Sequence, residues 1–174
     1  MSRATIHLMI FGLFFLGNSL FSQNLVTLKK GDTAPNFIEI DDDGNKINLE
    51  SYRGKIVLLN FTATYCGPCY ETYHPMDALQ KKYKEELKII SIHMDQNKDL
   101  WERRINEKGI NFNVSSIWDS DQKDELFEMY GANGFPYFVL INEDGVVKKK
   151  WFGNLERKLN KNTKKAIRKI KTSS

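Results

Sequence analysis

The chain has 174 residues, of which 41% are apolar, 12% aromatic and 28% charged, and its formal net charge is +4. These proportions are ordinary for a soluble globular protein, and the length suits one domain with a full-sized core. The sequence contains no internal repeats, low-complexity stretches or linkers rich in proline or serine, which excludes repetitive and multidomain architectures.

Basic residues are concentrated at the C-terminal end of the chain. From Lys148 onward, eleven Lys or Arg residues stand against a single acid, Glu156, so the preceding part is net acidic. A basic tail can bind anionic lipid, nucleic acid or an acidic partner. Apolar residues recur in this tail at helical spacing, however, which favours an amphipathic helix docked on the domain. We therefore expect no nucleic-acid partner; separately, we expect a monomer. The apolar residues are Leu155, Leu159, Ala166, Ile167 and Ile170.

The N-terminus has the order of regions found in a secretory signal peptide. Arg3 is the only charged residue among the first 28, and an apolar run at 8–17 and a more polar stretch at 18–23 follow it. The apolar run is shorter than the roughly 20 residues of a membrane-spanning helix. We predict a signal peptide at 1–22 and a folded domain at 23–174 in the periplasm or another extracytoplasmic compartment. An uncleaved N-terminal anchor is the alternative.

The predicted elements alternate between strands and helices. An irregular segment at 31–35 leads into a hairpin, whose strands at 37–40 and 46–49 are joined by an acidic turn at 41–45. The acidic residues lack the spacing and the terminal glutamate of an EF-hand, so a turn is favoured over a calcium loop. The later elements are a strand at 56–62, a helix from 66 to about 86, a strand at 87–93, a helix at 98–107, a strand at 114–117, a helix at 123–130, strands at 137–141 and 146–151, and a terminal helix. This order predicts an α/β fold with a mixed central sheet flanked by helices on both faces.

The only two cysteines, Cys66 and Cys69, are separated by Gly67 and Pro68 at the predicted start of a helix. This spacing lets one sulfur reach the other, so the pair can open and close as a disulfide. The unpaired N–H groups and the dipole of the first helical turn favour a thiolate, which lowers the pKa of Cys66 below the free value of about 8.5. Pro68 is tolerated because its missing N–H has no partner in a first turn. Cys66 is therefore the expected nucleophile and Cys69 the resolving thiol.

Two other uses of the cysteine pair are disfavoured. Zinc takes four ligands, and beside the thiols the chain offers only His7, His74 and His93, of which His7 lies in the predicted signal peptide. A purely structural disulfide around so short a loop would restrain little entropy of the unfolded chain. We therefore expect a redox role in which the Cys66–Cys69 disulfide is the redox group, without a metal or an organic cofactor.

A second motif precedes the strand at 137–141. Gly134, Phe135 and Pro136 place a proline directly before an apolar strand. This motif resembles the cis-proline loop of the thioredoxin superfamily, which lies beside the dithiol in that fold, and a cis X–Pro bond marks a constrained turn. The resemblance implies that the backbone of Phe135 pairs with an extended substrate segment next to Cys66. A trans proline at the start of a strand is the alternative.

From Gly31 to Ile170 the sequence resembles the extracytoplasmic thioredoxin-like proteins of the TlpA/ResA type. The shared motifs are 31–37, 54–61 leading into the CxxC pair, and 134–136, and an insertion at about 96–120 is also typical of that group. The resemblance implies a thioredoxin-like fold with an N-terminal β-hairpin extension and an insertion before the proline loop. It also implies a thiol–disulfide oxidoreductase, commonly a reductant of exported proteins such as apocytochrome c. The implied partners are protein disulfide substrates and an upstream membrane thiol that donates electrons.

Three positions depart from the pattern of that group. Tyr65 replaces the tryptophan before the first cysteine, Asn60 stands where thioredoxin has a buried aspartate, and Glu71 is displaced from the usual glutamate position. Tyr65 keeps an aromatic cover, and we expect it to bind substrate together with Phe135 and Pro136. Asn60 is expected to tune the dithiol, although it cannot accept the proton of the resolving thiol. Glu71 either serves the dithiol as a base or a pKa-raising charge, or belongs to a solvated helix face. His74 points away from the sulfurs around the helix, and for His93, at the end of a strand near the site, a structural role is favoured.

Two function classes follow from these features. In an oxidoreductase, the Cys66 thiolate attacks a substrate disulfide and Cys69 then releases the product. In a binding module, the dithiol and His93 hold a soft metal such as Cu(I). A peroxidase, suggested by an N-terminal motif similar to that of AhpC/TSA proteins, is disfavoured because the setting of its cysteine is absent. Related dithiols span about −270 to about −120 mV, and Gly67 and Pro68, which tune this value, match the pair in thioredoxin and favour a reductant.

Overall fold

The computed structural model describes residues 27–153 and 156–173. The predicted signal peptide and Leu155 of the predicted terminal helix lie outside these ranges. The strands are β1 (Ile38–Ile40), β2 (Lys46–Asn48), β3 (Ile56–Thr62), β4 (Leu87–His93), β5 (Ser115–Ile117), β6 (Tyr137–Ile141) and β7 (Val147–Phe152). The helices are the 3-10 helix η1 (Leu49–Tyr52) and the α-helices α1 (Gly67–Lys82), α2 (Lys98–Glu107), α3 (Lys123–Met129) and α4 (Glu156–Ser173).

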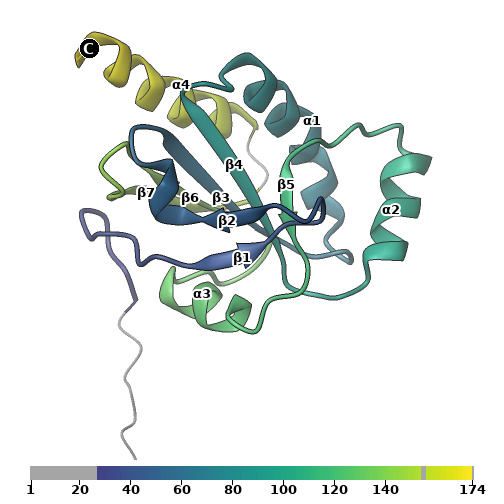
Figure 1. The fold of residues 1–174 in the computed structure, drawn as a ribbon. Helices are drawn as coiled ribbons and strands as arrows, with labels where there is room; N and C mark the ends of the chain where they lie inside the picture. The colour runs from purple at the N-terminus through teal and green to yellow at the C-terminus, as the bar shows by residue number, and fades with distance from the viewer. Residues whose placement is uncertain (1–26, 154–155, 174) are drawn as a thin grey trace, which may run out of the picture.

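The central sheet has the strand order β5-β4-β3-β6-β7, and β1 and β2 form a separate antiparallel hairpin (Figure 1). Strand β3 is parallel to β4, and β4 is parallel to β5, whereas β6 is antiparallel to both β3 and β7. Every residue of β3 is buried, because the strand is paired on both edges and covered on both faces. Its almost continuous apolar sequence follows from that position. The predicted mixed sheet between layers of helices is confirmed.

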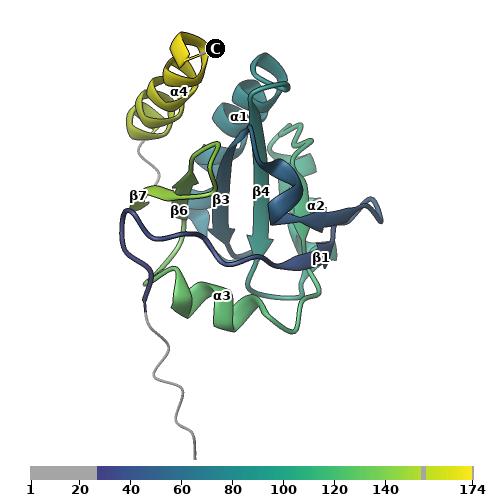
Figure 2. The same ribbon diagram turned by 60° about the vertical axis from the view of Figure 1, so that its left-hand side comes forward.

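Two groups of buried side chains cover the opposite faces of the central sheet. Figure 2 shows α1 and α4 at the top of the view and α3 at the bottom. One group joins the sheet to α1, α2 and α4 through side chains such as Tyr73, Trp101 and Ile167. The other joins it to α3 and the N-terminal hairpin through side chains such as Leu126 and Ile47. Successive residues of β3 and β4 point to opposite faces, so each of these two strands contributes to both groups.

The insertion predicted at 96–120 supplies α2 and β5. Asn97 caps the start of α2, since its side-chain oxygen accepts a hydrogen bond from the N–H of Leu100 at 3.3 Å. Strand β5 extends the sheet beside β4, with Ser115 in register with Ile90. Because β3 and β4 are parallel, the insertion begins at the sheet edge where β3 leads into α1.

Helix α1 is shorter than predicted. The sequence predicts a helix to about residue 86, but α1 ends at Lys82, where the N–H of Tyr83 bonds to the carbonyl of Leu79 at 3.0 Å. The N–H of Leu87 then bonds to the Tyr83 carbonyl at 2.8 Å, so a turn replaces the last predicted turn of helix. The residues between Tyr83 and Leu87 are polar, and they carry no apolar periodicity that would mark the end of the helix.

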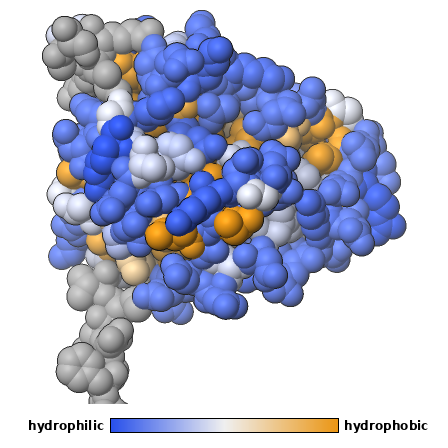
Figure 3. All heavy atoms as spheres, viewed as in Figure 1, coloured by the Kyte–Doolittle hydropathy of each residue, from blue (hydrophilic) through white to orange (hydrophobic). Residues whose placement is uncertain are grey.

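The surface is predominantly polar on the face shown in Figure 3, where apolar side chains form only small areas. Ile38 and Ile40 of β1 are 48% and 55% exposed. The acidic turn beyond β1 forms as predicted, with Asp41 accepting a hydrogen bond from the N–H of Asn45 at 2.8 Å. Across the described ranges, no helix combines the length and the apolar character needed to cross a bilayer.

Helix α4 docks on the domain as the helical spacing predicts. Leu159, Thr163 and Ile167 lie four residues apart on one helix face and are 1%, 0% and 2% exposed. Residues on the other faces, such as Arg157 and Lys158, are exposed. Basic residues of the tail such as these therefore lie on the solvent side of a packed helix.

Replacing Leu159 tests this docking. We expect Leu159→Ala to lower the free energy of unfolding by about 2–4 kcal/mol, because it removes a buried side chain and leaves a cavity. Urea unfolding followed by circular dichroism measures the change. The neighbouring exposed substitution, Lys158→Ala, should change the free energy by no more than about 0.5 kcal/mol. Equal effects of the two substitutions would contradict the docked helix.

Candidate dithiol site

The two cysteines lie where β3 leads into α1. Cys66 is the N-cap residue of α1, and the N–H of Cys69 bonds to the Cys66 carbonyl at 3.1 Å. Gly67 and Pro68 occupy the first turn, where a missing N–H costs no hydrogen bond. The side chain of Cys66 makes no capping hydrogen bond. The partial positive charge of the helix N-terminus therefore acts on the Cys66 sulfur.

The sulfurs of Cys66 and Cys69 form a disulfide, with an S–S distance of 2.08 Å and Cα atoms 5.4 Å apart. Cys66 is 7% exposed and Cys69 is 0% exposed. A thiol or disulfide from solution therefore reaches Cys66 first. This asymmetry is what the predicted roles of nucleophile and resolving thiol require.

Aromatic residues border Cys66. Tyr65 is 71% exposed, and its ring meets that of Phe135 edge-on with centroids 6.0 Å apart. Phe135 in turn contacts Phe127 of α3, with centroids 5.4 Å apart. The peptide bond between Phe135 and Pro136 is cis. The structure thus brings together two residues predicted to bind substrate, Tyr65 and Phe135, from distant parts of the sequence.

Asn60 and Glu71, which are predicted to tune the dithiol, and His74, which is not assigned to it, lie in different environments. Asn60 is 0% exposed, and its amide nitrogen donates to the hydroxyl of Ser91 on β4 at 3.0 Å. The amide oxygen of Asn60 has no hydrogen-bond partner among the described residues. Glu71 and His74 are exposed on α1. Asn60 therefore supplies a neutral polar group inside the sheet, while Glu71 and His74 face solvent.

His93 ends β4 inside a group of aromatic side chains. It is 0% exposed, its ring stacks on Trp118 with centroids 3.5 Å apart, and it meets Trp101 edge-on at 5.3 Å. Neither ring nitrogen has a hydrogen-bond partner among the described residues. Burial lowers the pKa of His93 to about 3, so the ring is neutral. This packing is that of a core side chain.

Sequence reasoning missed a group of polar residues around Thr64, two positions before Cys66. Asp95, just after β4, accepts hydrogen bonds from the backbone N–H of Thr64 at 2.5 Å and from its hydroxyl at 2.7 Å. The Thr64 carbonyl accepts hydrogen bonds from Arg104 of α2 at 2.6 Å and from the hydroxyl of Tyr70 at 2.9 Å. The available sequence signal was that Asp95 follows a strand predicted beside the one that leads to Cys66.

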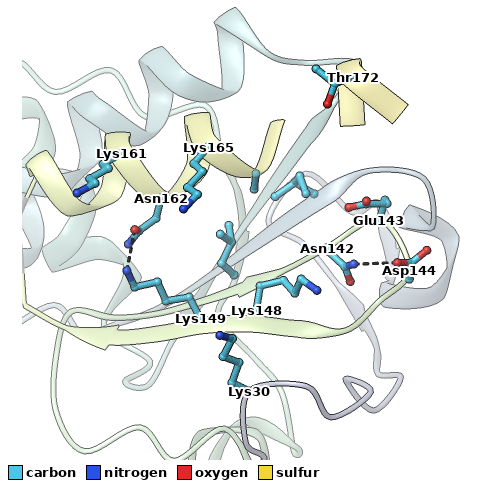
Figure 4. Close-up of a pocket in the computed structure, with 13 residues that line it drawn as sticks. Lys30, Asn142, Glu143, Asp144, Lys148, Lys149, Lys161, Asn162, Lys165 and Thr172 are labelled. Atoms are coloured by element: carbon cyan, nitrogen blue, oxygen red, sulfur yellow. Dashed lines mark hydrogen bonds between the residues drawn. The ribbon is translucent and has the colours of Figure 1, made fainter. Parts of the chain in front are cut away.

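A basic cleft of about 890 Å³ lies at the opposite end of β3, between α4 and the β6–β7 hairpin (Figure 4). Its floor includes Ile56, the first residue of β3, and Lys149 on one wall donates to Asn162 on the other at 2.9 Å. Strand β3 has seven residues, so the cleft lies about 20 Å from the dithiol and is separate from it. The lysines that line the cleft are Lys30, Lys148, Lys149, Lys161 and Lys165.

A mixed sheet with a CxxC disulfide at the start of α1 and a cis-proline before β6 defines a dithiol protein with the thioredoxin fold. Residues 29–167 match the Redoxin family model, and the chain belongs to this family. The predicted resemblance to the TlpA/ResA group is confirmed by the relatives described next.

The relatives are thiol–disulfide exchange proteins by name. The chain is 36% identical over 118 residues to "Thiol-disulfide oxidoreductase ResA" of Bacillus anthracis. The aligned segment covers 67% of this chain and 66% of that protein, slightly less than two thirds of its length. The chain is 30% identical over 149 residues to ResA of Halalkalibacterium halodurans, covering 85% and 81% respectively. A solved structure from Chlorobium tepidum, named as the thiol:disulfide interchange protein DsbE, has a TM-score of 0.70 and 26% identity, covering 81% of this chain and 99% of that one.

The burial of His93 gives the stability of the protein a defined pH dependence. His93 titrates near 6.5 when unfolded, whereas burial lowers its pKa to about 3 in the folded state. Below pH 6.5 the unfolded state therefore binds a proton that the folded state excludes. We expect the free energy of unfolding to fall by up to about 1.4 kcal/mol per pH unit from this residue between pH 6.5 and about 4.5. Urea unfolding across this window measures the slope.

Two substitutions separate this effect from other titrations. His93→Phe keeps an aromatic ring and removes the titrating group, so it should flatten the curve in this window. His74→Gln removes an exposed histidine from α1 and should leave the slope unchanged. An unaltered slope in His93→Phe would show that His93 does not set it.

Proposed function

We propose that this chain is an extracytoplasmic thiol–disulfide oxidoreductase that reduces disulfides in exported proteins. The observation that carries the proposal is the placement of Cys66 and Cys69 at the start of α1, with Cys66 7% exposed and Cys69 0% exposed. Two-step exchange needs this arrangement, because the first sulfur must meet the substrate and the second must meet only the first. The names of the ResA relatives support the same activity.

The exchange balances atoms and electrons between the two cysteines and the substrate. The Cys66 thiolate attacks one sulfur of the substrate disulfide, an S–S bond forms between them, and the other substrate sulfur leaves as a thiolate. Cys69 passes its proton to the substrate thiolate released in the first step, since the amide of Asn60 cannot accept it, and attacks the Cys66 sulfur. The mixed disulfide breaks and the second substrate thiolate leaves. The substrate has gained two electrons, and Cys66 and Cys69 form a disulfide.

The substrate docks as an extended segment beside the proline loop. In this proposal the backbone of Phe135, before Pro136, pairs with the substrate strand and aligns its disulfide with the Cys66 sulfur. Tyr65 and Phe135, whose rings lie 6.0 Å apart, contact the side chains next to the substrate cysteine. Backbone pairing is independent of side-chain identity, so we expect many substrates with apolar residues beside the cysteine.

Repeated turnover needs an electron donor, because each cycle leaves the Cys66–Cys69 disulfide. We place this donor at the membrane, as a thiol protein that reduces Cys66–Cys69 by the same exchange chemistry. Residues 1–22 direct the domain formed by 23–174 out of the cytosol, and the domain acts there as a monomer. The dithiol carries both electrons, so the reaction uses no metal and no organic cofactor.

Substitution of each cysteine tests the two roles. We expect Cys69→Ser to accumulate mixed disulfides with substrate proteins, because the second step cannot occur, and Cys66→Ser to accumulate none. Electrophoresis without reductant, followed by mass spectrometry of the trapped proteins, measures both. The double variant Cys66→Ser/Cys69→Ser gives the background. Similar trapping by the two single variants would refute the assigned roles.

The reduction potential tests the direction of electron flow. Equilibration of the purified protein in thiol/disulfide buffers should give a value near or below about −250 mV, typical of a reductant. A value above about −180 mV would make the protein an oxidant or isomerase. The lack of a reversible two-electron transition would overturn the proposal and favour the soft-metal alternative, which a copper titration of the protein and of His93→Ala then examines.

A further inference from the structure

Two side chains of opposite charge, from other parts of the fold, form hydrogen bonds to the turn before Cys66. The N–H of Cys66 bonds to the carbonyl of Ala63 at 3.0 Å, which closes a tight turn with Thr64 in its first half. Asp95 and Arg104 reach Thr64 from the end of β4 and from α2 respectively. The proposed function assigns no role to Asp95 or Arg104.

Asp95 binds the donor groups of the turn. Its carboxylate accepts three hydrogen bonds, from the N–H and hydroxyl of Thr64 at 2.5 and 2.7 Å and from the N–H of Asn97 at 3.1 Å. Burial acts to raise the pKa of Asp95, but the hydrogen bonds from Thr64 and Asn97 outweigh it and hold the pKa below its usual value. Asp95 therefore carries a full negative charge beside the turn at neutral pH.

Arg104 binds the acceptor group of the same residue. Its guanidinium donates to the Thr64 carbonyl at 2.6 Å, next to the hydroxyl of Tyr70, which donates to the same oxygen at 2.9 Å. Tyr70 follows Cys69 directly on α1, so the Thr64 carbonyl that it shares with Arg104 links α2 to the start of the dithiol helix. Both polar groups of the Thr64 backbone are thus fixed by residues of opposite charge.

We propose that Asp95 and Arg104 are positioning residues that set the reactivity of Cys66, by fixing the turn before it and by placing a balanced pair of charges near its sulfur. The inference rests on the proposed dithiol function and deepens it. Thr64 lies two residues from Cys66, at most about 7 Å between Cα atoms, so both charged side chains bind a residue close to Cys66. The two charges oppose each other: the carboxylate of Asp95 disfavours a thiolate, and the guanidinium of Arg104 favours one.

Other charged or titratable groups around Cys66 differ from this pair. Glu71 is exposed on the adjoining helix, and His93 is buried and neutral. The ammonium of Lys108, beyond α2, lies 5.9 Å from the ring centroid of Tyr70. Phe135, from the proline loop, brings no charge. Asp95 and Arg104 are the charged side chains, among the described residues, for which hydrogen bonds to the Thr64 turn are observed.

The pair predicts shifts of opposite sign in the pKa of Cys66. For a charge about 10 Å from the sulfur, removal of that charge should move this pKa by roughly 0.3 to 1 pH unit. Asp95→Asn should lower it and Arg104→Gln should raise it. A turn that was only loosened would give shifts of the same sign in both variants, because each variant loses hydrogen bonds to the same residue. The sign therefore separates an electrostatic role from a purely structural one.

The experiment uses Cys69→Ser as the background, so that Cys66 is the only thiol, and measures the rate of alkylation by iodoacetamide from pH 5 to 10. Arg104→Lys keeps the positive charge and should restore most of the shift seen in Arg104→Gln. Asp99→Asn and Arg103→Gln remove the same kinds of charge from exposed positions on α2 and should leave the pKa unchanged. Shifts of equal sign, or none, in Asp95→Asn and Arg104→Gln would overturn the inference.

A second readout uses the protein with both cysteines. Equilibration with glutathione should show Asp95→Asn displaced toward the dithiol and Arg104→Gln toward the disulfide, each by about two- to tenfold in the equilibrium constant, because a stabilised thiolate favours the reduced form. If Asp95→Asn does not fold, Arg104→Gln and its rescue by lysine decide the matter. The alkylation rates report on Cys66 itself, so failure of this inference is distinct from failure of substrate trapping by the parent protein.

Discussion

The pairing of β3 with a strand on each edge is the constraint on which the rest of the structure depends. Thr62 is in register with His93 of β4, and Phe61 is in register with Tyr137 of β6. These pairings extend to the end of β3, so three segments reach the same sheet edge together: the turn before Cys66, the chain after β4 and the proline loop. The disulfide, its aromatic border and the charges around the turn all follow from this register. A slip of one residue would send each of these side chains to the wrong face.

The layer beneath the disulfide is aromatic and closed to water. Tyr73 lies one turn beyond Cys69 on α1, and its hydroxyl is 2.9 Å from the hydroxyl of Thr62 and accepts from the indole N–H of Trp101 at 3.2 Å. Burial raises the pKa of Tyr73 to about 12, so it remains a neutral hydroxyl. The polar tips of these side chains satisfy one another within an apolar surrounding. Cys69 therefore packs with buried aromatic side chains and is 0% exposed, whereas Cys66 retains 7% of its exposure.

The sequence predicts the scaffold better than the contacts around the sulfurs. Apolar runs in the sequence predict buried strands, and the strands at 56–62, 87–93 and 137–141 have the predicted bounds. The short helix η1 depends on a cap by Asn48 and has no apolar period to reveal it. Asp95 and Arg104 resemble ordinary surface residues in the sequence. Their importance arises only when folding places them against Thr64, which no local pattern records.

The contacts of the turn before Cys66 also determine how late in synthesis of the chain the site can be assembled. Thr64 bonds to residues 31 and 40 positions later, so its partners leave the ribosome well after the cysteines do. Contacts of such sequence separation can form only after the intervening chain has been synthesised, and closing so long a loop costs entropy. Until then, Cys66 and Cys69 lie on an incomplete chain, without the hydrogen bonds that Asp95 and Arg104 make to Thr64. Completion of α2 thus marks the point in biogenesis at which the turn before Cys66 can gain all of these bonds.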